Sequence, residues 1–180
     1  MALLAEALVD EWLNRKGFFT VRGIKHGVEE IDLLGVRYSE GGLEACHVEV
    51  QASFRPMGYL SPMPSDLAGE LGINQRSAKK RDDDLVKKCA QKWVEKKFTS
   101  ESKRAVREKA WQGLSWRMIF VHAEMKYPLE LETVKSCGIE TIELVKVLSE
   151  LRHDLAKGVR GSAGTDIAEI IEYFNQRSDK

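Results

Sequence analysis

The chain has 180 residues, of which 43% are hydrophobic and 31% charged; this excludes a disordered chain and predicts one domain, residues 1–180, with its own core. Twenty-eight basic residues balance 28 acidic residues, so the total charge indicates neither a nucleic-acid nor a membrane partner. Three cysteines without a CxxC pair argue against a disulfide framework and a zinc knuckle, and favour a cytoplasmic location.

The first third of the chain predicts a helix followed by an antiparallel meander. Leu4, Leu8 and Trp12 recur every four residues and predict a helix over residues 2–15. The next segments have the apolar alternation and glycine-rich turns that are typical of strands joined by hairpins. We expect strands at residues 18–21, 31–38 and 43–52, with turns at residues 23–27 and 40–42.

The remainder predicts alternating helices and strands, so the fold class is α/β. Residues 53–74 contain three of the four prolines and are expected to form a surface loop, either beside the site or as a tolerated insertion. We expect helices at residues 77–98, 101–110, 129–136, 145–157 and 166–176, strands at residues 114–122 and 139–144, and a glycine-rich connector at residues 158–164.

Charge is distributed unevenly along the chain. Residues 75–109 carry 13 basic and 6 acidic side chains, whereas residues 1–74 carry 6 basic and 11 acidic ones. An acidic block can hold a metal ion and a basic block can hold phosphate, although a solvated helix face is the commoner meaning of such a run. The acidic N-terminus does not fit a signal peptide, and no apolar run approaches the ~18 residues that span a membrane.

Two carboxylates in neighbouring strands are the most informative feature. Asp32 lies in the run EEIDLL and Glu49 in the run HVEVQ. A hairpin can bring Asp32 and Glu49 together, and carboxylates in mid-strand are costly unless they are paired or bind a cation. Two converging carboxylates suit Mg²⁺, which can promote phosphodiester hydrolysis. The same spacing also fits a hairpin with a solvated polar face, and spacing alone does not separate these interpretations.

The segments EEIDLLG and HVEVQ, after a helix that contains a glutamate, resemble the core of the PD-(D/E)XK nuclease superfamily. The resemblance implies a restriction-endonuclease-like α-β-β-β-α-β core over about residues 2–122. It leaves an α/β, largely helical C-terminal extension over about residues 123–180. It also implies a Mg²⁺ or Mn²⁺ centre whose ligands are Glu6, Asp32, Glu49 and the carbonyl oxygen of Val50.

Gln51 stands where this superfamily usually carries a lysine. That lysine orients the attacking water and offsets negative charge, whereas glutamine offers an amide without charge. The resemblance implies that Gln51 positions the water. If the following helix folds back over the sheet, we expect a replacement cation from Lys79 or Lys80.

The basic stretch after the strands resembles the DNA-facing helix of such folds. Phosphate contacts need only well-placed cations, and they make binding depend on salt. Trp93 has helical spacing to Cys89 and Leu85, which favours a place in the core over a role in base stacking. The residues expected to contact DNA are Arg76, Lys79, Lys80, Lys87 and Lys88.

The sequence therefore predicts a metal-dependent deoxyribonuclease, with Asp32, Glu49 and Gln51 as catalytic residues, that binds DNA and no membrane. A homodimer is expected by analogy with nucleases that cut two strands. A second hypothesis is a catalytically inactive nuclease-like module for DNA binding or assembly, which Gln51 and the neutral net charge favour. A third is an α/β domain that binds a small molecule or a protein and whose carboxylates are merely superficial.

Overall fold

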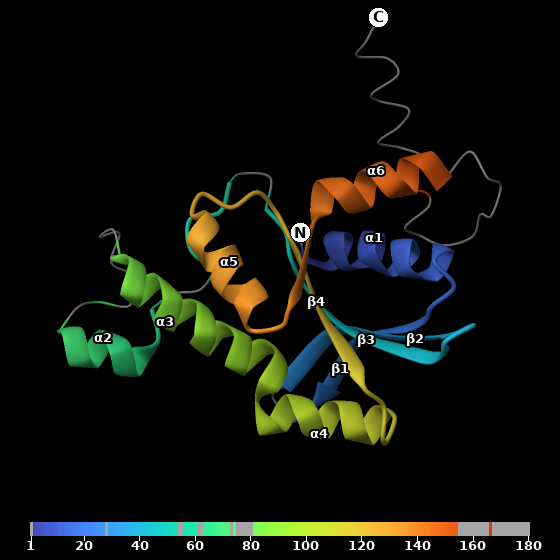
Figure 1. The fold of residues 1–180 in the computed structure, drawn as a ribbon, viewed down its shortest axis with the longest axis horizontal. Helices are drawn as coiled ribbons and strands as arrows, with labels where there is room; N and C mark the ends of the chain where they lie inside the picture. The colour runs from blue at the N-terminus through green and yellow to red at the C-terminus, as the bar shows by residue number, and fades with distance from the viewer. Residues whose placement is uncertain are drawn as a thin grey trace, which may run out of the picture.

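The chain folds around a mixed β-sheet of five strands with helices on both faces (Figure 1). The computed structural model describes residues 2–27, 29–53, 56–60, 63–72, 74, 81–154 and 166. In chain order the elements are α1 (Ala2–Arg15), β1 (Phe19–His26), β2 (Glu29–Ser39), β3 (Gly42–Gln51), α2 (Ser65–Leu71), α3 (Asp83–Val94), the π-helix η1 (Glu95–Thr99), α4 (Glu101–Ala110), β4 (Trp116–His122), α5 (Pro128–Ser136), β5 (Glu140–Glu143) and α6 (Leu144–Asp154).

The strands lie in the order β1-β2-β3-β4-β5. Strands β1, β2 and β3 pair antiparallel, as the predicted meander requires, whereas β4 and β5 join parallel to β3. Parallel neighbours need a long crossover, and the helices from α2 to α4 provide it between β3 and β4. This architecture confirms the predicted α/β class and is compatible with a restriction-endonuclease-like core, although other α/β folds share it.

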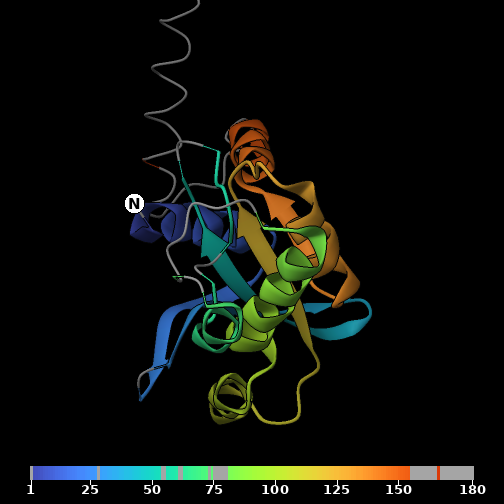
Figure 2. The ribbon, with the colours of Figure 1, turned by 90° about the vertical axis from the view of Figure 1, so that its left-hand side faces the viewer.

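One face of the sheet is covered by α1 and α6, which pack side by side (Figures 1 and 2). Their apolar stripes meet the alternate residues of β3, so that Leu8, Val48, Val50 and Leu151 belong to one buried cluster. Burying each such side chain contributes about 1.5–3 kcal/mol. The Trp12 indole completes this layer by donating a hydrogen bond from Nε1 to Glu150 at 2.8 Å.

The opposite face is covered by α3, η1, α4 and α5. Trp93 and Phe98 pack against Phe120 of β4, and Val106 of α4 packs against β2. Helix α3 begins at Asp83 because the side chain of Asp82 caps it, accepting a hydrogen bond from the backbone N–H of Leu85 at 2.8 Å. The burial of Trp93 confirms its predicted place in the core.

Some predicted boundaries are wrong. Strand β1 continues through residues 23–26, where we expected a turn, and α2 lies inside segment 53–74, which we expected to be a loop. Of the helix expected from residue 77, residues 77–80 lie outside the described residues, and α3 begins at Asp83. The predictions for residues 155–165 and 167–180 lie outside the described residues.

The three cysteines are free thiols in the structure, as their spacing predicted. Cys46 and Cys89 are buried and Cys137 is exposed. Burial raises the pKa of the Cys46 thiol to about 11, which makes it an unreactive part of the core. No helix in the described part of the chain is long and apolar enough to cross a membrane.

Candidate active site

Strand β2 parts from β3 at Asp32. The β2–β3 ladder ends at the pair Leu33–Val48, whereas the pairing of β1 with β2 continues beyond it. At this fork the Asp32 side chain replaces the missing strand contact, because its Oδ2 accepts a hydrogen bond from the backbone N–H of Val50 at 2.7 Å. Gly23, opposite Asp32 on β1, has a φ of 59° that favours glycine. The fork therefore opens the sheet beside Asp32 and Glu49.

Glu49 is buried on β3, with 1% of its surface exposed, and both of its oxygens accept hydrogen bonds. Oε2 accepts from Lys97 Nζ at 2.6 Å, and Oε1 accepts from Lys103 Nζ at 2.9 Å. Burial alone would raise the pKa of Glu49, but the hydrogen bond from His47 and the two ammonium groups hold it below its usual value. Glu49 is thus an ionised carboxylate at neutral pH.

His47, two residues before Glu49, is fixed in one tautomer. Arg107 Nη1 lies 2.9 Å from His47 Nδ1, and an arginine can only donate. Nδ1 is therefore the acceptor, and Nε2 carries the proton that points at Glu49 Oε1, 3.1 Å away. Burial also lowers the pKa of His47, which favours the neutral ring. His47 thus orients the Glu49 carboxylate as a neutral donor.

Two helical segments deliver the cations to Glu49. Lys97 comes from η1, and Lys103 and Arg107 lie one turn apart on α4. The Lys103 ammonium, almost fully buried, also donates to the backbone carbonyl of Glu30 near the start of β2. A buried ammonium is costly unless it is paired, so these contacts fix α4 against the fork.

Further carboxylates surround the same point. Burial raises the pKa of Asp32 to about 6, and the nearby Glu49 charge adds to the rise. Burial and then the Glu30 charge raise the pKa of Glu6 on α1, while the Lys97 ammonium opposes the rise. The Lys97 pKa is raised despite burial, chiefly by Glu49 and then by Asp32 and Glu30. The carboxylates of Glu6, Asp32 and Glu49 and the Lys97 ammonium therefore interact electrostatically at the fork.

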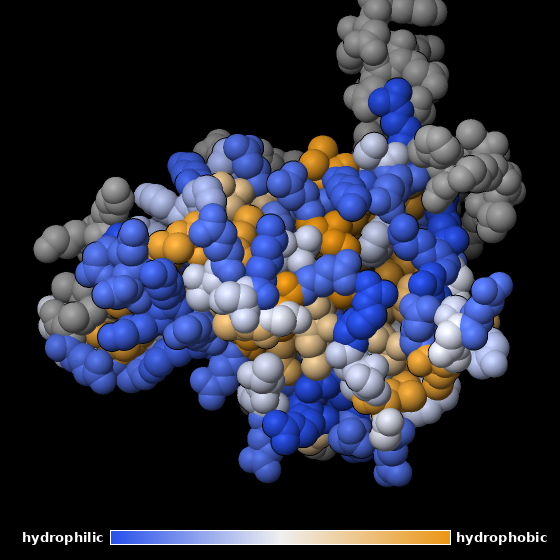
Figure 3. Space-filling view, in the orientation of Figure 1, coloured by the Kyte–Doolittle hydropathy of each residue, from blue (hydrophilic) through white to orange (hydrophobic). Residues whose placement is uncertain are grey.

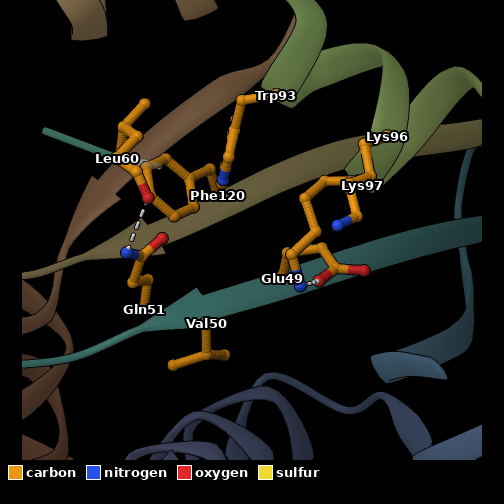
Figure 4. Close-up of a pocket in the computed structure, with 8 residues that line it drawn as sticks. All are labelled: Glu49, Val50, Gln51, Leu60, Trp93, Lys96, Lys97 and Phe120. Atoms are coloured by element: carbon orange, nitrogen blue, oxygen red, sulfur yellow. Dashed lines mark hydrogen bonds and ion pairs between the residues drawn. The ribbon is translucent and has the colours of Figure 1, made fainter. Parts of the chain in front are cut away.

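A pocket of about 320 Å³ opens beside Glu49 (Figure 4). Gln51 lines it, and the Gln51 Nε2 donates to the carbonyl oxygen of Leu60 at 3.0 Å. Trp93 and Phe120 line the same pocket, and Lys97, which also lines it, reaches Glu49 from η1. In this structure the cation beside the pocket that pairs with Glu49 is thus Lys97 of η1, and not a residue of β3.

Lys97 and Lys103 are the site residues that sequence reasoning missed. Lys97 carried a signal, because it follows Leu85, Cys89 and Trp93 at the same four-residue interval. A lysine that extends a buried row must find an acidic partner inside the protein. Lys103 lies 54 residues from Glu49, and no local pattern links them.

The expected DNA contacts divide into two groups. Lys87 and Lys88 are exposed on α3, on the side away from its buried row, where phosphates could reach them. Figure 3 shows a largely hydrophilic surface over α2 and α3. Arg76, Lys79 and Lys80 lie outside the described residues.

The carboxylate oxygens at the fork are ligands that suit a hard divalent cation, and a bound substrate can supply the remaining ligands. No cluster of three or more His, Cys, Asp or Glu residues placed to hold a metal ion exists among the residues that the structure describes. Mg²⁺ does not require such a cage, since it is commonly held by one or two carboxylates, waters and substrate phosphates. The high pKa of Asp32 means that a nearby cation would favour its ionised form.

Comparison with known proteins identified no relative. No protein-family model, no curated protein and no solved structure matches the chain. The geometry of the fork is therefore the basis on which a function can be argued.

Proposed function

We propose that the protein is a metal-dependent nuclease that hydrolyses phosphodiester bonds in DNA, with the PD-(D/E)XK arrangement that its sequence resembles. The observation that carries the proposal is the convergence of Asp32, Glu49 and Lys97 at the point where β2 leaves β3. Carboxylates and a lysine around a cleft supply ligands for a metal and a counter-charge for a phosphate.

In this proposal Asp32, Glu49 and the carbonyl oxygen of Val50 hold Mg²⁺ or Mn²⁺, and Glu6 adds an outer carboxylate. When bound, such an ion supplies an activated water and stabilises negative charge on the reacting phosphate. The Val50 N–H fixes the Asp32 carboxylate, and His47 fixes the Glu49 carboxylate.

Lys97 takes the role that the superfamily usually assigns to the lysine at the position of Gln51. Its ammonium lies on the Glu49 carboxylate and interacts with Asp32, so it can donate to a phosphate oxygen or to the attacking water. Lys103 stays buried and keeps Glu49 in place. The exposed Lys87 and Lys88 contact the DNA backbone.

The alternative is a nuclease-like module that binds DNA or assembles without cutting. Both oxygens of Glu49 accept from ammonium groups, and a site that has replaced its metal by permanent ion pairs would have this geometry. In that case Lys97 would hold the carboxylate as a structural partner and would not yield to a divalent ion.

Cleavage with and without metal separates the two functions. Plasmid, linear, single-stranded and branched DNA are incubated with Mg²⁺ or Mn²⁺ and either wild-type protein or Asp32→Asn. The asparagine keeps an acceptor for the Val50 N–H, so the variant should fold. We expect the wild type to cleave and the variant to lose at least about 100-fold, since even outer-sphere partners of a metal are worth 10- to 100-fold. DNA binding without cleavage by the wild type supports the inactive module.

We also propose that a second copy of this chain covers the outer end of the sheet. Strand β1 is an edge strand, and Phe19 on it is 82% exposed, as is Tyr38 on β2 at 83%. Phe19 lines an apolar groove along this edge together with Trp111 and Trp116. Aromatic side chains of about 150–250 Å² each supply much of the ~800 Å² that a partner buries in a stable dimer.

Light scattering coupled to size exclusion tests the dimer. We expect a dimer for the wild type and a monomer for Phe19→Glu combined with Tyr38→Glu, because a charge on each partner would be desolvated at the interface. A monomeric wild type at high concentration overturns this assignment.

A further inference from the structure

The pocket beside Glu49 has a wall that phosphodiester hydrolysis does not require. Leu60, Trp93 and Phe120 form this wall, and we name the space between it, Gln51 and Lys96 the Trp93 pocket. Its volume of about 320 Å³ lies in the range of pockets that hold small organic molecules. Metal and phosphate need only oxygen ligands and cations, so the apolar wall indicates a further, apolar part of the ligand.

Trp93 turns an unused donor toward this pocket. The residue is 94% buried, since its exposed fraction is 6%. The indole N–H has no hydrogen-bond partner among the described residues, and unlike the N–H of Trp116 it is not sealed off by surrounding atoms. Figure 4 shows the indole beside Phe120 with its nitrogen edge turned toward the strands. A buried aromatic N–H usually finds a partner, so a ligand acceptor is the natural one.

Gln51 presents the complementary group. A carbonyl oxygen only accepts, so the amide group that faces Leu60 O must be the NH₂ of Gln51. The Gln51 carbonyl oxygen is then the free end, and it has no partner among the residues that the structure describes. The pocket therefore offers one donor and one acceptor beside apolar surfaces.

The walls of the pocket are held before any ligand arrives. Leu60 is fixed at both ends, because its backbone N–H donates to Glu130 at 3.0 Å and its carbonyl accepts from Gln51 at 3.0 Å. The Trp93 ring packs on Phe120, with ring centroids 4.5 Å apart. Binding to such a preorganised pocket costs little ordering entropy.

The position of the cations defines what joins the apolar part of the ligand. Lys96 and Lys97 line one side of the pocket, next to Glu49, and the rings line the other. A ligand that satisfies both sides has a flat ring with a hydrogen-bonding edge, linked to a phosphate. A nucleotide has this chemistry, with its base on the wall and its phosphate at the lysines. A paired base is stacked in the duplex and its edge is occupied, so the base must be unpaired.

We propose that the Trp93 pocket binds an unpaired nucleobase of the substrate strand, which directs the protein to single-stranded, branched or frayed DNA. This inference rests on the proposed function, because it places the neighbouring phosphate at the Glu49 and Lys97 site. It differs from that function in predicting recognition of a base where hydrolysis needs only the backbone.

Binding without metal tests the pocket apart from catalysis. In EDTA, fluorescence anisotropy is measured with two labelled 12-mers: oligothymidine and an abasic deoxyribose-phosphate oligomer with the same phosphates. We expect the wild type to prefer oligothymidine about tenfold or more, since stacking one base is worth about that factor. Trp93→Phe keeps a ring but loses the N–H, and should reduce this preference about fivefold. Trp111→Phe, which removes an indole outside the pocket, is the matched control and should leave this preference unchanged.

The outcomes distinguish this inference from the proposed function. Equal affinity for the two oligomers, or an unchanged preference in Trp93→Phe with intact folding by circular dichroism, overturns base recognition even if Asp32-dependent cleavage is observed. A Trp93-dependent preference for oligothymidine supports the pocket even if no DNA is cleaved, in which case the nuclease assignment fails alone. Absence of binding to both oligomers overturns the inference.

Discussion

The two faces of strand β3 differ completely in character. Cys46, Val48 and Val50 point into an apolar layer made with α1 and α6. His47 and Glu49, which alternate with them, are equally buried but lie in a network of charges from η1 and α4. The same five residues therefore place a dry core on one side and a polar site on the other, a few ångströms apart.

This contrast separates the residues whose burial stabilises the fold from those whose burial costs stability. A buried apolar side chain needs no specific partner, and another apolar side chain of similar volume stabilises the core almost as well. The polar face needs every partner, because an unpaired charge there costs several kcal/mol. A polar layer of this kind beside a pocket is typical of a functional site, since a core alone would be simpler to build from apolar residues.

The largest effect should come from removing the central cation of the polar face. We expect Lys97→Met to reduce metal-dependent cleavage by about 100-fold, the usual worth of one preorganised donor to a developing charge. The same change should strengthen Mn²⁺ binding, measured by calorimetry, because the ammonium no longer repels the ion from Glu49.

Lys109→Met is the matched control, since Lys109 of α4 is exposed and donates to neither oxygen of Glu49 in the structure. It should leave cleavage within a few-fold of the wild type and Mn²⁺ affinity unchanged. If Lys97→Met cuts normally, Lys97 is a structural partner of Glu49 and the catalytic cation lies elsewhere.

The apolar face should respond in stability only. Val48→Ala removes two methyl groups from a fully buried position, and we expect a loss of about 2 kcal/mol in the free energy of unfolding, measured in urea. Cleavage per folded molecule should stay at the wild-type level, because the Val48 side chain lies on the face away from Glu49. A large loss of activity in the folded variant would show that the two faces are coupled.

Asp32 should show the opposite behaviour to Val48. Its pKa is raised from 3.8 to about 6, so the folded state favours the protonated form and loses stability as the pH rises from about 4 through 6. Without metal at pH 7.5, Asp32→Asn should therefore raise the free energy of unfolding by about 3 kcal/mol, at 1.36 kcal/mol per pKa unit. The gain should vanish at about pH 3, where the wild-type carboxyl is protonated in both the folded and the unfolded state. Thermal unfolding in EDTA at the two pH values measures this, and a destabilised variant at pH 7.5 contradicts it.

Sequence patterns predicted the local half of this site. The alternation in EEIDLL and HVEVQ predicts Asp32 and Glu49 on neighbouring strands of one hairpin. In the structure the ladder ends at Leu33–Val48, and the hydrogen bond from the Val50 N–H to Asp32 links the two strands beyond that pair. The helix with Glu6 also follows from periodicity, and strand β4 follows from its apolar run, although its parallel direction was not predicted. These features depend on residues close in sequence, where the chain geometry fixes what can meet.

The other half depends on contacts that local patterns do not encode. Lys97 and Lys103 reach Glu49 from 48 and 54 residues away, and their positions follow from how η1 and α4 pack on the sheet. The π-helix that turns Lys97 inward has no signature in the basic run where it lies. Helix α2 was missed because prolines and glycines surround it, which is the composition of a loop.

Glu130 extends the contrast to a buried acid outside the proposed metal site. Burial raises its pKa from 4.5 to about 7, while the Leu60 N–H and Arg81 oppose the rise. The folded state therefore loses stability as pH rises from 4.5 through 7, because the carboxyl must ionise in a buried position. We expect Glu130→Gln to unfold with a free energy about 3 kcal/mol higher than the wild type at pH 8, and equal to it at about pH 3. Glu132→Gln, exposed on the same helix, should show no such difference.

Oligothymidine binding gives a second readout for Glu130→Gln. This variant keeps an acceptor for the Leu60 N–H, so the wall of the Trp93 pocket should persist and binding of oligothymidine should not change. A pH-independent effect would mean that Glu130 acts only through that hydrogen bond, and weakened oligothymidine binding would mean that its charge reaches the pocket.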